Sequence, residues 1–156
     1  MAKSAINADL AATLDLVAAG CAVLSDDWWV FGGAGMALAG VPDLDPPDVD
    51  LIVSERDAIQ LIALWGAHIQ TGEASPLFRS RIFAKAQIGP LPVEIMAGFE
   101  VREPHGWSPV WPRTRQTVER PGGMLFIPTS AEQAEICRRF GRPKDLARLA
   151  ALEALS

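Results

Sequence analysis

The fold is decided by two stretches of sequence, Trp-Val-Phe-Gly-Gly-Ala-Gly-Met-Ala-Leu-Ala-Gly at residues 29–40 and Asp-Val-Asp-Leu-Ile-Val at residues 48–53. In the first stretch a hydrophobic run breaks into glycines, where a strand can pass into a helix. The second stretch carries Asp48 and Asp50 one residue apart, and alternate side chains of a strand share a face. Two like charges held this close repel each other unless a cation lies between them. The pair therefore predicts a metal site beside the glycine turn.

Hydrophobic periodicity predicts helices and strands that alternate along the chain around these stretches. Gly20 is expected to end the first helix, and three prolines exclude regular structure from the loop at residues 41–47. Residues 78–97 are typical of a β-hairpin, whereas residues 99–123 are expected to be largely irregular. The predicted strands are residues 28–31, 49–53, 78–88 and 93–97, with short strands near 115–118 and 124–127, and the predicted helices are residues 5–19, 34–39, 55–65, about 130–140 and 144–155.

Length and composition favour one domain spanning residues 1–156, and the order of the predicted elements favours an α/β fold with a mixed sheet flanked by helices. The chain has 156 residues, of which 49% are hydrophobic, which suffices for one core but not for two. The net charge is −5 and no basic stripe is present, which argues against binding of long nucleic acid. Cys21 and Cys137 lack metal-site spacing, and no segment has the ~18 apolar residues of a membrane span. We therefore expect a cytoplasmic protein with reduced thiols and no membrane partner.

A third acid, Glu94, lies in the apolar run at residues 93–97, where an unpaired carboxylate is costly. If that strand is a neighbour of the strand with Asp48 and Asp50, three acids converge on one spot. Three oxygen ligands without histidine or thiol suit Mg²⁺ or Mn²⁺ rather than zinc. Sites of this kind commonly bind phosphates.

Gly32 and Gly33 could form the phosphate-binding site, because glycines allow close approach of the backbone and the following helix presents free amide groups. Acids and glycines together suggest a nucleoside triphosphate. Two simpler interpretations stay open, since close helix–strand packing would explain the glycines and a solvated strand end would explain the Asp pair. A dinucleotide-binding fold is disfavoured, because the glycines lack the required spacing.

Together these motifs resemble the signature of the nucleotidyltransferase superfamily, which includes DNA polymerase beta, drug-modifying nucleotidyltransferases and the minimal nucleotidyltransferases of bacterial toxin–antitoxin pairs. The matching residues are Phe31-Gly32-Gly33, Asp48-Val49-Asp50-Leu51, and Glu94 within Val-Glu-Ile. Residues 140–146, Phe-Gly-Arg-Pro-Lys-Asp-Leu, also resemble the Lys-Asp helix that ends many small members. The motifs cover about residues 25–100, and the helices at 129–155 extend the resemblance over most of the chain.

The resemblance implies a transfer of a nucleoside monophosphate from ATP or another nucleoside triphosphate to a hydroxyl group of a small molecule or protein. It implies that Asp48 and Asp50 bind two Mg²⁺ or Mn²⁺ ions and that Gly32 and Gly33 hold the triphosphate. Glu94 would help to bind one metal and could activate the acceptor hydroxyl. A homodimer or a partner protein could complete the cleft.

Positive charge for the phosphates could come from Arg79, Arg81 and Lys85, which alternate along the predicted strand before Glu94. A solvated strand face would explain the same alternation. Lys144 is interpreted instead as half of a local pair with the next residue at a helix start.

Two tryptophans in the irregular segment, Trp107 and Trp111, could stack on a base or on the ring of an acceptor. Ordinary packing is the alternative. The loop before Asp48 carries Asp43 and Asp45, whose charge would repel a triphosphate. A second hypothesis is therefore a nucleotidyltransferase-like protein with little or no activity that acts as a binding or antitoxin-type partner.

Overall fold

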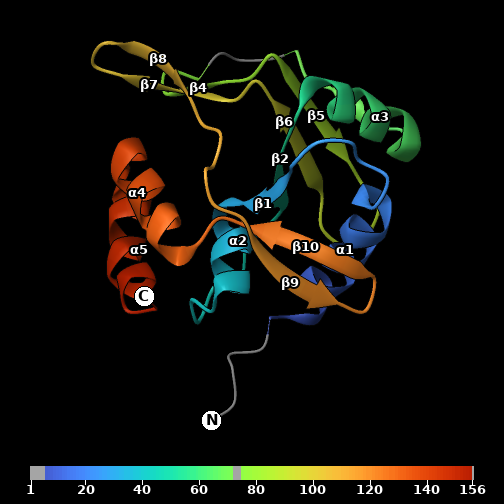
Figure 1. Ribbon diagram of the computed structural model, residues 1–156, viewed down its shortest axis with the longest axis horizontal. Helices are drawn as coiled ribbons and strands as arrows, with labels where there is room; N and C mark the ends of the chain where they lie inside the picture. Colours follow the sequence, from blue (N-terminus) through green and yellow to red (C-terminus); the bar gives the residue numbers. More distant parts are fainter. Residues whose placement is uncertain (1–5, 72–74, 156) are drawn as a thin grey trace.

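The computed structural model describes residues 6–71 and 75–155 and has a mixed β-sheet at its centre (Figure 1). The sheet has five strands in the order β1 (Trp29–Phe31), β2 (Val49–Val53), β6 (Val93–Ala97), β5 (Ile82–Ala86) and β3 (His68–Ile69). Strands β2 and β6 are parallel, and the other neighbours are antiparallel. The predicted α/β class with a mixed sheet is confirmed.

One face of this sheet is covered by helices α1 (Ala8–Cys21) and α3 (Glu55–Trp65) and by the hairpin of β9 (Gln116–Arg120) and β10 (Gly123–Ile127). In Figure 1 the two helices lie at the right of the sheet. Buried aliphatic side chains from all these elements form the main core, including Leu10, Leu14, Leu51, Leu61, Ile95 and Leu125.

The opposite face is covered by α4 (Ser130–Phe140) and by a second sheet, ordered β4 (Phe78–Arg79), β7 (Glu100–Glu103) and β8 (Gly106–Pro109). Here the core is rich in aromatic residues, and it joins Ile52 and Met96 of the central sheet to Phe99 and Phe140. The last helix, α5 (Pro143–Glu153), packs with α4 against α2 (Gly32–Ala39). In Figure 1 the α4–α5 pair lies at the left and the second sheet lies at the top.

The first helix differs from its predicted bounds. Asn7 caps α1 by accepting a hydrogen bond from the backbone N–H of Leu10, so Ile6 and Asn7 precede the helix, and residue 5 lies outside the described residues. Gly20 does not end the helix, which continues to Cys21. A Cβ at Gly20 would lie 2.6 Å from the ring of Trp65, so this glycine permits close packing of α1 and α3.

The predicted strand at residues 78–88 is divided between two sheets. Residues 82–86 form the expected hairpin with β6, in which Ala84 pairs with Ile95. The chain turns at Gly98, whose φ is 63°, and passes into β7, which pairs with β4 in the second sheet. The β7–β8 hairpin was not predicted, because its strands are short and lie in a segment rich in turn residues.

The bounds of β2, α3 and β6 agree with those predicted from the sequence, and Ser54 caps α3 as expected. The final helix ends at Glu153 rather than at residue 155. No helix in the described part of the chain is long and apolar enough to cross a membrane.

Candidate active site

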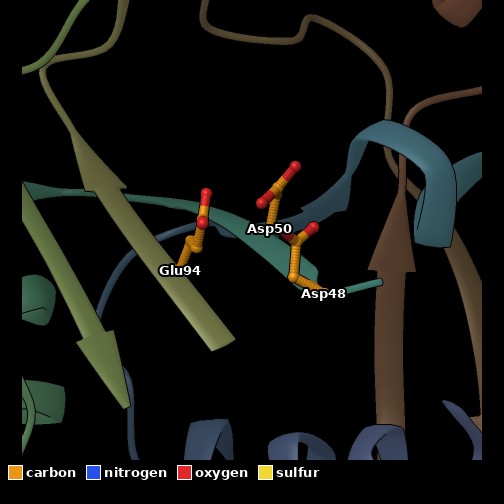
Figure 2. Close-up of side chains that lie close together, drawn as sticks. All are labelled: Asp48, Asp50 and Glu94. Carbon is orange, nitrogen blue, oxygen red and sulfur yellow. The ribbon is translucent and has the colours of Figure 1, made fainter. Parts of the chain in front are cut away.

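Three carboxyl groups lie together over the parallel strands β2 and β6 (Figure 2). Asp50 is the register partner of Glu94, and Asp48 precedes β2 by one residue. One carboxylate oxygen from each of the three side chains lies within 4.8 Å of the other two. The structure therefore brings the three acids together in the arrangement expected from the sequence.

Asp50 is electrostatically the least favourable member of this cluster. Burial raises its pKa to about 8, and the charges of Asp48 and Glu94 act in the same direction, whereas Lys144 opposes them. The pKa of Asp48 is also raised, first by desolvation and then by Glu94. Two neighbouring acids thus disfavour each other's ionised forms in the metal-free protein.

One oxygen of Asp50 has no hydrogen-bond partner in the part of the chain that the structure describes. Among the described residues, no donor reaches its buried Oδ1 atom. A buried carboxylate oxygen without a partner is costly, and such atoms in native proteins usually have a functional reason. A divalent cation held by oxygen ligands would satisfy this atom and offset the repulsion among the three acids, so the residues fit Mg²⁺ or Mn²⁺.

The glycine turn approaches this cluster closely. Gly32 has a φ of 64°, and a Cβ at this position would lie 2.8 Å from Oδ2 of Asp50. A Cβ at Gly33 would lie 3.1 Å from Pro46. The N-cap of α2 is Phe31, which forms no side-chain hydrogen bond to the amides of the first turn. These amides are therefore available to an anion next to the three acids.

A cavity of about 870 Å³ opens in front of the three acids. It is bounded by the glycine turn, by helices α4 and α5, and by the second sheet. Its size is within the range of ligand sites in proteins, which is roughly 300–1,000 Å³. Besides the three acids, its lining includes aromatic side chains and cationic side chains.

Of the cations proposed from the sequence, Arg79 is the one that lines this cavity. Its Nε lies 2.6 Å from Oε1 of Glu100, and its guanidinium group stacks on Trp107 at 4.4 Å from the ring centroid. Trp107 lines the cavity too. Trp111, in contrast, packs edge-to-face against Trp29 and is not part of the cavity wall.

Arg81 and Lys85 lie outside the cavity lining. Arg81 lies in the break between β4 and β5, and its guanidinium group pairs with Glu55 at 3.6 Å. The Nζ atom of Lys85 lies 3.6 Å from Oε2 of Glu94. The three cations expected along one strand therefore do not share one face, and each has a carboxylate partner.

Two other cations line the cavity from α5, namely Lys144 and Arg148. Neither forms an ion pair within residues 6–71 and 75–155, and the charge of Lys144 acts on both Asp48 and Asp50. They are four residues apart, so they share one side of the helix. The interpretation of Lys144 as half of a helix-start pair needs correction, because the next residue, Asp145, is bound to Arg142 at 2.6 Å.

The acids of the preceding loop do not line the cavity. Asp45 accepts a hydrogen bond of 3.0 Å from Asn7, and Asp43 adopts a turn conformation with a φ of 59°. Pro46 and Pro47 are the residues between positions 41 and 47 that line the cavity wall. The negative charge of this loop is therefore directed away from the site.

No protein-family model and no curated protein matches this chain. Solved structures do match, and they define the class of fold as that of the nucleotidyltransferases. The chain thus has the nucleotidyltransferase fold, which confirms the resemblance drawn from its motifs.

Three of these structures illustrate the likeness. TM1012 from Thermotoga maritima, provisionally assigned as a nucleotidyltransferase, is 20% identical with a TM-score of 0.76, over 94% of each chain. The lincosamide antibiotic adenylyltransferase LnuA, bound to lincomycin, is 12% identical with a TM-score of 0.52, over 83% of this chain and 87% of its own. ANT(2")-Ia, in complex with adenylyl-2"-tobramycin, is 14% identical with a TM-score of 0.52, over 91% and 86%.

Proposed function

We propose that this protein is a metal-dependent nucleotidyltransferase that moves a nucleoside monophosphate from ATP or another nucleoside triphosphate to a hydroxyl group. The acceptor would belong to a small molecule or a protein. The observation that carries this proposal is the buried Oδ1 of Asp50, which has no hydrogen-bond partner among the described residues and lies in a cluster of three carboxylates beside the glycine turn. A purely structural site would have little reason to keep this arrangement.

The ligands of the metal would be Asp48, Asp50 and Glu94. Bound Mg²⁺ or Mn²⁺ would supply charge stabilisation to the attacking and leaving oxygens of an in-line displacement. The three side chains meet the main requirement for this role, because they offer only oxygen atoms and lie close enough to share a cation.

The phosphates would lie against the first turn of α2, where the amides of Gly32 and Gly33 can donate to their oxygens. Lys144 and Arg148 would neutralise the phosphate charge, because they line the cavity without carboxylate partners among the described residues. Arg79, Arg81 and Lys85 were candidates for the same role. Their ion pairs with carboxylates make them the weaker candidates.

In the reaction, the acceptor oxygen forms a bond to the α-phosphorus, and the bond from that phosphorus to the bridging oxygen breaks, so that pyrophosphate leaves. Glu94 would accept the proton of the acceptor hydroxyl, because its strand β6 is separated by β2 from the glycine turn that follows β1. The folds of LnuA, a lincosamide antibiotic adenylyltransferase, and of ANT(2")-Ia, solved with adenylyl-2"-tobramycin, support the general kind of reaction.

Calorimetric titration of the protein with ATP, in the presence and absence of Mg²⁺, tests this proposal. We expect Mg²⁺-dependent binding in the parent protein, loss of binding in Asp50→Asn, and retention in the control Asp43→Asn, whose site lies outside the cavity. Absence of metal-dependent nucleotide binding in the parent protein would overturn the proposal. Binding without pyrophosphate release in the presence of acceptors would favour the second hypothesis, a binding protein without activity.

A further inference from the structure

The cavity contains an aromatic compartment, which we define by Phe78, Phe83, Met96, Phe99 and Trp107. Met96 lies two residues beyond Glu94 on β6, on the same face of the sheet, and Phe83 is its register partner on β5. Phe78, Phe83 and Trp107 are only partly buried, so their rings are accessible from the cavity. The compartment therefore begins beside Glu94 on β6 and β5, which β2 separates from β1 and the glycine turn, and its Phe99 also contacts Phe31.

Two lining guanidinium groups lie over rings of the compartment, and both are paired with carboxylates. Arg79 stacks on Trp107 and is paired with Glu100. The second guanidinium group, that of Arg142, lies 4.8 Å from the ring centroid of Phe78 and is paired with a carboxylate of α5. That carboxylate, Asp145, is the only one among the described lining residues outside the cluster of three acids. A third guanidinium group, that of Arg102, lies 5.7 Å from the ring centroid of Trp107 but is not part of the lining.

The walls of the cavity formed by α2 and α5 carry positive charge and free donors instead of aromatic rings. Lys144 and Arg148 face it without ion-pair partners among the described residues, and the amides of α2 are free there. Phosphoryl transfer places the attacking and leaving oxygens roughly in line on opposite sides of the phosphorus. A triphosphate tail at the glycine turn thus leaves the acceptor to approach from the side of Glu94, through the aromatic compartment.

We infer that the aromatic compartment binds the acceptor, and that this acceptor is an uncharged hydroxyl compound with a flat apolar face about the size of one ring. The inference rests on the proposed function, since it names the molecule that receives the nucleotide. Accessible aromatic rings favour stacking on such a face. A polyamine acceptor would bring several ammonium groups next to carboxylates that are already paired, at a large cost of desolvation.

Three probes separate these possibilities: 4-nitrophenyl β-D-glucoside, methyl β-D-glucoside without the ring, and the polycation tobramycin. Their dissociation constants can be measured by saturation-transfer NMR titration of the full chain with Mg²⁺ and α,β-methylene ATP. The variants are Trp107→Ala, Trp107→Phe and the matched control Trp111→Ala, which alters a tryptophan outside the cavity. Calorimetry of each variant with Mg²⁺ and the nucleotide alone reports the nucleotide site independently.

We expect the nitrophenyl glucoside to bind more tightly than the other two probes. Trp107→Ala should weaken its binding by at least about tenfold, the usual effect of removing a stacking ring. Trp107→Phe should restore most of the affinity, and Trp111→Ala should leave it unchanged. Nucleotide binding should be the same in all three variants.

Tighter binding of tobramycin, or unchanged glucoside binding in Trp107→Ala, would overturn the inference. An equal loss of nucleotide binding in Trp107→Ala would overturn it as well, because the compartment would then hold the base. A parent protein that binds the glucoside but not the nucleotide would refute the proposed function, and with it the acceptor role of the compartment.

Discussion

Gly32 and Asp50 are in such close contact that a Cβ on the glycine would lie 2.8 Å from the carboxylate Oδ2. The glycine also has a φ of 64°, a conformation that costs other residues about 1–2 kcal/mol. Gly66 has nearly the same φ, 62°, but no heavy atom lies within 4 Å of its Cβ position. These two glycines therefore separate the effect of backbone conformation from the effect of crowding at the site.

We expect Gly32→Ala and Gly66→Ala each to lower the free energy of unfolding by about 1–2 kcal/mol. Only Gly32→Ala should also remove Mg²⁺-dependent ATP binding, since the added methyl group displaces Asp50. Chemical denaturation and calorimetry measure the two effects. Equal nucleotide binding in the two variants would show that the contact between Gly32 and Asp50 is unimportant for the site.

Asp50→Asn should make the metal-free protein more stable. Burial and two neighbouring acids raise the pKa of Asp50 to about 8, so at neutral pH this carboxyl must take up a proton on folding, a cost that an amide does not have. A gain of about 1–3 kcal/mol is expected, which corresponds to a rise in Tm of about 2–4 °C per kcal/mol for a chain of this size. Thermal denaturation at neutral pH in EDTA measures it.

Added Mg²⁺ with ATP should reverse this order of stability. The parent protein gains stability from ligands that bind only the folded state, whereas Asp50→Asn does not. If Asp50→Asn is less stable than the parent protein when both are measured without metal, Asp50 does not lower the stability of the metal-free protein. That result would contradict this explanation.

Lys144→Gln and Arg148→Gln should each weaken ATP binding by about tenfold or more, as expected for loss of a charged contact with phosphate. Arg81→Gln is the matched control, because Arg81 is paired with Glu55 outside the cavity. Calorimetric titration with Mg²⁺-ATP compares the three variants. If Arg81→Gln weakens ATP binding more than the other two variants, Arg81 binds the phosphates as the sequence predicts. The assignment of this role to Lys144 and Arg148 is then wrong.

A separate prediction concerns acid stability. The hydrogen bonds from Arg56, and then from Ser54, lower the pKa of Asp26 to about 2, below the value of about 3.9 for an unfolded chain. The folded state therefore releases this proton more readily, and the resulting stabilisation is complete above about pH 4 and is lost as the pH falls towards 2. Urea denaturation between pH 2 and pH 5 should show a shallower pH dependence in Asp26→Asn than in the parent. The control Glu119→Gln, at an exposed position of β9, should retain the parent's slope.

The part of the site on β2, α2 and β6 could be predicted from the sequence, because it is encoded locally. Val49–Val53 and Val93–Ala97 are buried runs bounded by polar or turn residues, so each acid within or beside them stands out. The pairing of Asp50 with Glu94 required only that the two strands be neighbours. The glycines in the first turn of α2 carry the remaining signal.

The positions of the two cations on α5 could not be predicted in the same way. Lys144 and Arg148 reach the acids only because α5 folds back on α4, and α4 packs against α2. The resemblance of residues 140–146 to the family's final helix was a signal, but it did not reveal which residue faces the site. The assignment of Arg81 relied on one continuous strand, whereas that region is divided at residues 80–81 between β4 of the second sheet and β5 of the central sheet.

A crystal structure of the protein with Mg²⁺ and α,β-methylene ATP tests the central claim most directly. The account predicts Mg²⁺ bound by Asp48, Asp50 and Glu94 beside the α-phosphate. It also predicts the terminal phosphates at the amides of Gly32 and Gly33, within reach of Lys144. A nucleotide bound elsewhere, or a nucleotide in the cavity with no ion on the three carboxylates, would contradict it.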